Sequence, residues 1–154
     1  MSERIQFSDA LPDAFKRLVN LHEYVVRIAT EEGLDPTLID MLKTRASQIN
    51  GCAFCTDMHS AEASAHGETQ RRLLALPVWW DTNLFSEQER AALALTEAMT
   101  TLPGTHGVPD DVYDRAAKVF TERQLAVVVW AASVINTFNR LGVTSRKPLP
   151  QAGR

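Results

Sequence analysis

The chain contains two cysteines, which lie three positions apart, and a histidine follows the second of them by four positions. These residues, Cys52, Cys55 and His59, belong to the stretch INGCAFCTDMH. Because residues three and four apart share one face of a helix, the sulfur atoms could form a reversible disulfide and the imidazole could accept the proton of Cys55. A thiol reacts as its thiolate, which the N–H groups at the start of a helix stabilise. The spacing therefore predicts dithiol redox chemistry, in which one cysteine attacks and its neighbour resolves.

Other uses of the cysteine pair make different demands on the chain. A structural zinc site needs four ligands, whereas this chain offers one cysteine pair and four scattered histidines: His22, His59, His66 and His106. A structural disulfide across so short a loop would constrain little of the unfolded chain. Two buried, inert thiols are the remaining alternative, which the polar residues around Cys55 disfavour. We therefore expect no bound metal and no organic cofactor.

The composition is that of an ordinary globular domain, with 45% hydrophobic and 23% charged residues in a chain of 154. A net charge of −3 gives no reason to expect nucleic acid or an anionic membrane as a partner. The N-terminal stretch has no basic segment followed by an apolar one, and no apolar run approaches the roughly 18 residues of a membrane span. We therefore expect a single cytoplasmic domain, residues 1–154, that binds neither nucleic acid nor membrane.

The elements that would position the cysteines are predicted to be helices. Apolar residues at three- and four-residue spacing indicate a first helix that ends near Gly33. Asp35 is placed to cap a second helix, which ends at a break over residues 50–51. Cys52 then opens a third helix, which stops near Gly67. The pair is therefore expected in the first turn of that helix.

The rest of the chain continues the helical pattern. A short helix closed by Pro77 is followed by a longer one, whose start has the capping-box residues Ser86 and Glu89. A further helix is predicted over residues 109–120. Thr121 then caps a last long helix, which is apolar on nearly all sides and is therefore expected at the centre of the fold or in an interface.

Together these elements predict an all-α domain of about six to eight helices. Its core is expected to span about residues 15–143, and residues 144–154 are expected to form a loop-like tail. Glu97 interrupts the apolar stripe of its helix. Because a buried carboxylate requires a partner, we expect Glu97 to pair with Arg90 or Arg140.

Three segments resemble the AhpD-like alkylhydroperoxidase family of the carboxymuconolactone decarboxylase superfamily. The first is LDPTLIDMLKTRASQINGCAFCTDMHSAEASAHGET, residues 34–69, and the others are FSEQERAALALTEAMT and FTERQLAVVVWAASVINTFNRLGV. The resemblance covers about residues 15–143. It implies an AhpD-like helical domain that assembles as a homo-oligomer, a trimer or a hexamer. It also implies reduction of organic hydroperoxides, with an external thiol donor such as a lipoyl protein or a thioredoxin-like protein.

The resemblance further implies roles for individual residues. Cys55 matches the peroxidatic cysteine, which attacks the peroxide, and Cys52 matches the resolving cysteine. His59 matches the histidine of a proton relay. The carboxylate of that relay is usually a glutamate twelve residues before the first cysteine, where this chain has the shorter Asp40. Asp40 is therefore expected either to complete the relay or to be a solvated charge beside Lys43.

Two further functions are compatible with these residues. One is a lactone decarboxylase like the namesake of the superfamily, a reaction that does not rely on a cysteine pair. The other is a redox-sensing or partner-binding module, in which the disulfide state changes assembly or binding without peroxide turnover.

Overall fold

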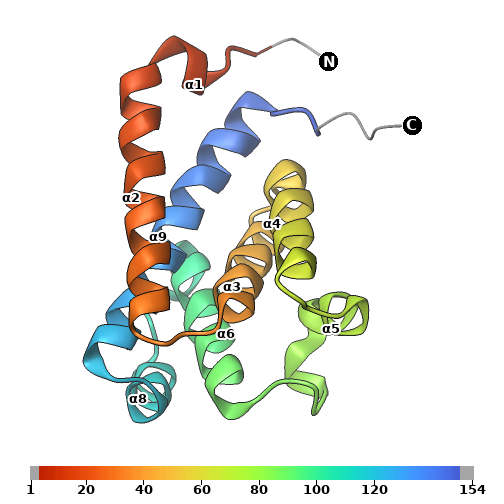
Figure 1. Ribbon diagram of the computed structural model, residues 1–154, viewed down its shortest axis with the longest axis vertical. Helices are drawn as coiled ribbons and strands as arrows, with labels where there is room; N and C mark the ends of the chain where they lie inside the picture. Colours follow the sequence, from red (N-terminus) through yellow and green to blue (C-terminus); the bar gives the residue numbers. More distant parts are fainter. Residues whose placement is uncertain (1–3, 150–154) are drawn as a thin grey trace.

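The computed structural model describes residues 4–149, which form helices and contain no β-strand (Figure 1). The predicted all-α class is therefore confirmed. In chain order the elements are α1 (Phe7–Ala10), α2 (Pro12–Glu31), α3 (Pro36–Ile49), α4 (Ala53–Ala65), α5 (Gln70–Ala75), the 3-10 helix η1 (Leu76–Asp81), α6 (Glu87–Thr100), α7 (Leu102–Thr105), α8 (Asp110–Val119) and α9 (Glu122–Ser145).

The helix starts are set by the capping residues that the sequence predicts. The side chain of Asp35 accepts a backbone hydrogen bond at the start of α3. Ser86 and Glu89 form a complete capping box at α6, and Thr121 forms one with Gln124 at α9. Each cap satisfies N–H groups that the first turn of a helix leaves without a partner. Where a side chain caps a helix, the boundary is therefore predicted well.

The helices differ from the prediction at the two ends of the domain. The first long helix, α2, begins at Pro12, whose fixed φ suits the first helical position, and the short α1 precedes it. The last helix continues to Ser145, so the predicted tail begins inside a helix. Arg146 ends that helix with a left-handed φ of 51°, and residues 147–149 follow. Residues 150–154 of the predicted tail lie outside the described residues.

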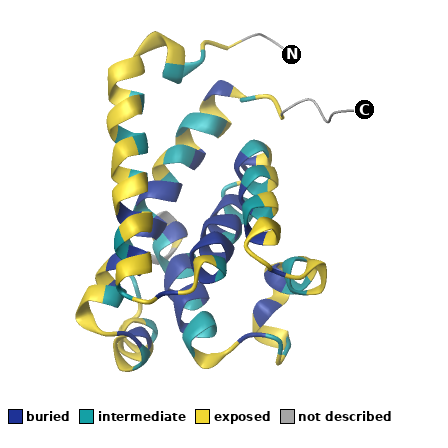
Figure 2. Ribbon diagram, in the orientation of Figure 1, coloured by how far each residue is buried: buried dark blue, intermediate teal, exposed yellow. Residues whose placement is uncertain are grey.

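The central helix of the domain is α3, most of which is buried (Figure 2). It packs against α4, α6 and α9, and α9 also packs against α2. The largest cluster of buried apolar side chains includes Val25, Leu38, Leu42, Leu95 and Val128. Burial of each such side chain contributes about 1.5–3 kcal/mol. Because α3 runs directly into the turn before α4, the best-packed helix of the fold sets the position of the cysteines.

An ion pair between α3 and α6 satisfies the carboxylate that interrupts the apolar stripe of α6. Oε1 of Glu97 accepts from Nε of Arg45 at 2.6 Å and from Nε1 of Trp79 at 2.9 Å. The predicted partners, Arg90 and Arg140, donate to backbone carbonyls. The predicted pairing of Glu97 with Arg90 or Arg140 is therefore wrong. Arg45 is the partner because α3 packs against α6, a contact that positions in the sequence do not indicate.

Helix α9 is long and apolar enough to cross a membrane by length and composition, with a mean hydropathy of 1.3 over its most apolar window. A helix in the core of a globular domain has the same character. In this fold α9 packs against α2, α3 and α6, and 39% of that window is buried. Val128 is fully buried, whereas Trp130 is 55% exposed. One face of α9 is thus central in the domain, and the other presents apolar surface.

Candidate redox site

The turn between α3 and α4 places the two cysteines at the start of α4. Gly51 makes this turn with a left-handed φ of 67°, a conformation that glycine adopts without a steric penalty. Cys52 is the N-cap of α4, and its Sγ accepts the backbone N–H of Cys55 at 3.3 Å. The predicted location of the pair at a helix N-terminus is confirmed. The N–H groups at this end of α4 favour a thiolate on Cys52.

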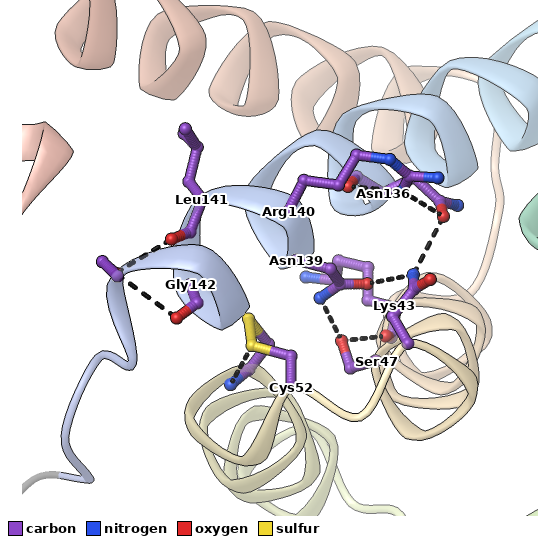
Figure 3. Close-up of a disulfide and its surroundings, with 11 residues drawn as sticks. Lys43, Ser47, Cys52, Asn136, Asn139, Arg140, Leu141 and Gly142 are labelled. Carbon is purple, nitrogen blue, oxygen red and sulfur yellow. Dashed lines mark hydrogen bonds between the residues drawn. A yellow bond between two sulfur atoms is a disulfide. The ribbon is translucent and has the colours of Figure 1, made fainter. Parts of the chain in front are cut away.

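Cys52 and Cys55 form a disulfide in this structure, with 5.3 Å between their Cα atoms (Figure 3). Both residues are nearly buried, with 2% and 3% of their surface exposed. Cys55 lines a partly enclosed cavity of about 260 Å³, together with His22 and His59. Cys52 lines a separate hollow. A small molecule that enters the cavity therefore lies against Cys55 and not against Cys52.

A network of side-chain amides, one of them fully buried, connects the cysteine turn to α9 (Figure 3). The fully buried Asn139 donates to Oγ of Ser47 at 2.9 Å and accepts from Nδ2 of Asn50 at 2.9 Å. Asn50 also donates to Oδ1 of Asn136 at 2.9 Å. The carbonyl of Ser47 in turn accepts the N–H of Cys52 at 3.0 Å. Because a buried amide is costly unless it is bonded, this network holds α9 and the cysteine turn in one arrangement.

The backbone of α9 lies against the disulfide at Gly142 (Figure 3). A Cβ atom at this position would lie 3.0 Å from Sγ of Cys52 and 3.4 Å from Sγ of Cys55. Both distances are shorter than the optimal separation of nonbonded heavy atoms, about 3.5–4.0 Å. Glycine inside a helix ordinarily costs about 1 kcal/mol relative to alanine. The close approach of the two sulfur atoms accounts for its presence here.

We expect Gly142→Ala to destabilise the oxidised protein, although the same exchange inside a helix ordinarily stabilises by about 1 kcal/mol. The added methyl group must displace a sulfur atom or α9, and overpacking of this kind costs about 1–3 kcal/mol. The urea unfolding midpoint of the oxidised protein measures the effect. In a Cys52→Ala, Cys55→Ala background the methyl group has room, so the substitution should raise the midpoint. A lower midpoint in both backgrounds would show that the sulfur contact is not the cause.

The histidine predicted to transfer protons lies in the cavity with Cys55 and is held by a carboxylate. His59 is buried, and its Nδ1 lies 2.8 Å from Oε2 of Glu62 on the same helix. The same Oε2 lies 3.3 Å from Nζ of Lys43. With Nδ1 engaged by Glu62, Nε2 is the nitrogen left to exchange a proton in the cavity. Glu62 is not among the predicted site residues, although its spacing of three residues from His59 indicates a contact on one face of a helix.

The carboxylate of Asp40 is bonded to residues other than His59. It is 4% exposed and lies 3.0 Å from Nζ of Lys43 and 2.5 Å from Nδ1 of His66. The expectation of a solvated charge is therefore wrong, because α4 packs on α3 and the residue that follows it, His66, bonds to the carboxylate. Asp40 is connected to His59 only indirectly: Asp40 contacts Lys43, Lys43 contacts Glu62, and Glu62 contacts His59. Its part in a proton relay stays a prediction, with two side chains in between.

Charges around the cavity shift two titrating groups. The hydrogen bond from His59, opposed by partial burial and reinforced by the charge of Lys43, lowers the pKa of Glu62 to about 2. Burial lowers the pKa of His22, and the charges of Lys43 and His59 lower it further. At neutral pH the cavity therefore holds an ionised Glu62 and a neutral His22. Within residues 4–149, no group of three or more His, Cys, Asp or Glu side chains is arranged to hold a metal ion.

The sequence is similar to that of known proteins over most of its length. Residues 12–98, which include both cysteines and His59, match the Carboxymuconolactone decarboxylase family. Over 143 residues the chain is 34% identical to YdfG, an uncharacterised protein of Bacillus subtilis (strain 168), with 93% of this chain and 94% of that protein covered. Over 92 residues it is 34% identical to YnjA, an uncharacterised protein of Escherichia coli (strain K12), with 60% and 50% covered.

Solved structures have the same fold. A protein of unknown function from Agrobacterium tumefaciens, suggested to be the antioxidant defence protein AhpD, superposes with a TM-score of 0.88 at 35% identity, covering 98% of this chain and 100% of that one. The debrominase Bmp8 superposes with a TM-score of 0.78 at 19% identity, covering 91% of this chain and 73% of that one. At that identity the likeness to Bmp8 concerns the fold alone.

Proposed function

Because the chain belongs to the carboxymuconolactone decarboxylase family and has the AhpD-like all-α fold, we propose that it reduces organic hydroperoxides with its cysteine pair. One observation carries the proposal: Cys55 and His59 line the same largely apolar cavity, and Cys52 caps the helix beside them. A nucleophile, a proton acceptor and a second thiol are thereby brought together. The two thiols supply both electrons, so the reaction as proposed uses no metal or organic cofactor.

In the oxidative half of the proposed cycle, Cys55 is the peroxidatic residue. His59 takes the thiol proton, and the thiolate attacks the terminal oxygen of the hydroperoxide. The O–O bond breaks, the alkoxide leaves with the proton from His59 as an alcohol, and Cys55 becomes a sulfenic acid. The thiol of Cys52 then condenses with the sulfenic acid. The products of this step are the disulfide and water.

In the reductive half, an external dithiol returns two electrons to the pair. Its thiolate attacks Sγ of Cys55, the sulfur that lines the cavity, and Cys52 leaves as a thiolate. The N–H of Cys55 and the N-terminus of α4 are placed to stabilise that leaving thiolate. A second thiolate of the donor then releases Cys55. We propose a lipoyl protein or a thioredoxin-like protein as the donor.

Glu62→Gln is expected to slow the oxidation of Cys55 about tenfold at neutral pH. The neutral amide no longer stabilises the imidazolium that forms as His59 accepts the thiol proton. Stopped-flow fluorescence of the reduced protein mixed with cumene hydroperoxide measures this rate. Glu122→Gln, which removes an exposed carboxylate at the start of α9, is the matched control and should leave the rate unchanged. A parental rate for Glu62→Gln would remove this carboxylate from the mechanism.

The same carboxylate makes stability depend on pH. The pKa of Glu62 in the fold, about 2, lies below the value of 4.5 for an unperturbed glutamate. Its ionised form therefore stabilises the fold above about pH 4.5, and this contribution is lost as the pH falls toward 2. Over this interval the urea midpoint of the parent should fall more than that of Glu62→Gln. Parallel curves for the two proteins would contradict the assignment.

Thiol titration tests the proposed reaction directly. The reduced protein is mixed with one equivalent of cumene hydroperoxide, and free thiols and the alcohol product are both counted. Loss of both thiols with one alcohol formed per protein supports the proposal, and thiols that persist while the peroxide is stable contradict it. Turnover with dihydrolipoamide or with a thioredoxin system then distinguishes the two classes of donor.

The match to a family named for carboxymuconolactone decarboxylase favours a second candidate, the decarboxylation of a lactone. That reaction has no need of the cysteine pair, so a Cys52→Ser, Cys55→Ser double variant separates the two functions. Lactone turnover by the double variant, with no peroxide consumption by the parent, would replace hydroperoxide reduction as the proposed function.

We also propose that the protein works in the cytoplasm as a homo-oligomer, a trimer or a hexamer. Leu21, Tyr24 and Trp130 form an exposed apolar surface over α2 and α9, which a second copy would remove from water. Light scattering of the reduced and the oxidised protein measures the assembly. A large redox-dependent change in assembly, with negligible peroxide turnover, would favour a redox-sensing module.

A further inference from the structure

The cavity beside Cys55 has the walls of a binding site for a compact apolar group. Its lining is dominated by aromatic and aliphatic side chains: Phe15, Val19, Phe54, Met58, Phe138 and Leu141. An apolar cavity of about 150 Å³ accommodates a benzene molecule. The cavity here, of about 260 Å³, therefore has room for a substituted ring or a branched chain of similar size.

The charges on the lining are not balanced. Three charged side chains face the cavity, and two of them, Lys43 and Glu62, lie 3.3 Å apart as an ion pair. The third is Lys147, which takes part in none of the ion pairs formed within residues 4–149. Its Nζ lies 4.1 Å from the ring centroid of Phe54 and 5.9 Å from that of Phe15. An ammonium group over two rings of an apolar cavity is complementary to an anionic group on a ligand.

A backbone hydrogen bond positions the start of the Lys147 side chain beside Gly142. Helix α9 ends at the left-handed Arg146, and the N–H of Lys147 donates to the carbonyl of Gly142 at 3.0 Å. Gly142 is the residue that approaches the two sulfur atoms. Phe54, which Lys147 covers, immediately precedes Cys55. Lys147 therefore contacts both elements beside the redox pair. Its backbone is bonded to Gly142 of α9, and its ammonium group lies over Phe54 of α4.

We propose that the cavity selects hydroperoxides that carry a carboxylate on a compact apolar body, and that Lys147 binds this carboxylate. The inference rests on the proposed hydroperoxide reduction and names its substrate class. A single ammonium group balances the single charge of a carboxylate, whereas a phosphate monoester carries about 1.5 to 2 negative charges at neutral pH and requires further donors. The described lining residues include no arginine.

A matched pair of substrates tests the inference: cumene hydroperoxide and its para-carboxylate derivative, which differ in the charged group alone. We expect Lys147→Met to raise KM for the carboxylate substrate about fivefold to tenfold, since the ion pair is lost while the apolar contact is kept. KM for cumene hydroperoxide and kcat for both substrates should stay at the parental values. Arg146→Met removes an exposed charge from the neighbouring position and should change neither KM by more than about twofold. Parental activity on the neutral substrate also shows that Lys147→Met is folded.

Binding of 4-isopropylbenzoate to the oxidised protein separates this inference from the proposed function, because the ligand contains no peroxide. Calorimetry that finds weaker binding to Lys147→Met than to the parent supports the carboxylate site. Equal binding to the two proteins, or a parent that prefers cumene hydroperoxide to its carboxylate, overturns it. If neither hydroperoxide oxidises Cys55 while the difference in binding persists, the proposed reduction fails and the carboxylate site stands.

Discussion

Cys55→Ser should abolish hydroperoxide reduction, with turnover falling by about a thousandfold or more to the background rate of the donor thiol. The serine hydroxyl nearly preserves the shape of the side chain in the cavity, but it is not a nucleophile toward peroxide oxygen at neutral pH. Peroxide loss in the presence of dihydrolipoamide measures the effect. Activity near the parental level would show that Cys55 is not the attacking group.

Cys52→Ser is the matched variant, because it removes the second sulfur and leaves the first in place. Cys55 should still react with one equivalent of hydroperoxide and then stop as a sulfenic acid, since no thiol remains to condense with it. Dimedone should label Cys55 in this variant, and mass spectrometry locates the label. Labelling of Cys52 in the Cys55→Ser protein would instead mean that the two roles are exchanged.

Lys43→Met should lower the free energy of unfolding by about 3 kcal/mol, the lower end of the cost of breaking a buried ion pair, because the buried Asp40 is then left with His66 as its partner. The side chains of Lys43 and Asp40 are 5% and 4% exposed, and they lie 3.0 Å apart. Lys43 also neutralises Glu62 at 3.3 Å. Methionine has a similar length and volume, so the exchange isolates the charge. Urea unfolding at neutral pH measures the loss.

Arg27→Met is the control for this prediction. Arg27 and Glu31 form an ion pair on the surface of α2, where their side chains are 57% and 51% exposed. Exposed pairs at this spacing contribute about 0.3–0.5 kcal/mol. An Asp40→Asn, Lys43→Met double variant should recover part of the stability that Lys43→Met loses, because less charge is left buried without a partner. A loss of similar size for Arg27→Met and Lys43→Met would show that burial does not set the strength of the network.

Local signals in the sequence are sufficient to predict the helices and the cysteine turn. Asp35, Ser86 and Thr121 cap the helices that they were expected to cap, because a capping bond joins residues two or three positions apart. The same locality places Cys52 and Cys55 at the start of α4. The sequence therefore predicts both the cysteine pair and the helix start at which it lies.

The charges around the pair depend on contacts between helices, which spacing along the chain does not encode. Asp40 contacts His66, 26 positions further along the chain, because α4 packs against α3. The contact of Glu62 with His59 is local in the sequence, but its contact with Lys43 joins two helices. Lys147 lies in a segment that was expected to be a loop-like tail and that has no periodic pattern. Lys147 lines the cavity because α9 ends at Arg146 and the N–H of Lys147 then bonds to the carbonyl of Gly142.

The small volume of the cavity also bears on which electron donor can reduce the disulfide through Cys55. A space of about 260 Å³ admits a thiol at the tip of a slender aliphatic arm, but it excludes the bulk of a folded redox protein. A globular donor would have to attack Cys52, which lines a separate and more open hollow. We therefore expect the proposed reduction at Cys55 to proceed with a dithiol on a flexible arm, whose thiol can enter the cavity, more readily than with a folded redox protein.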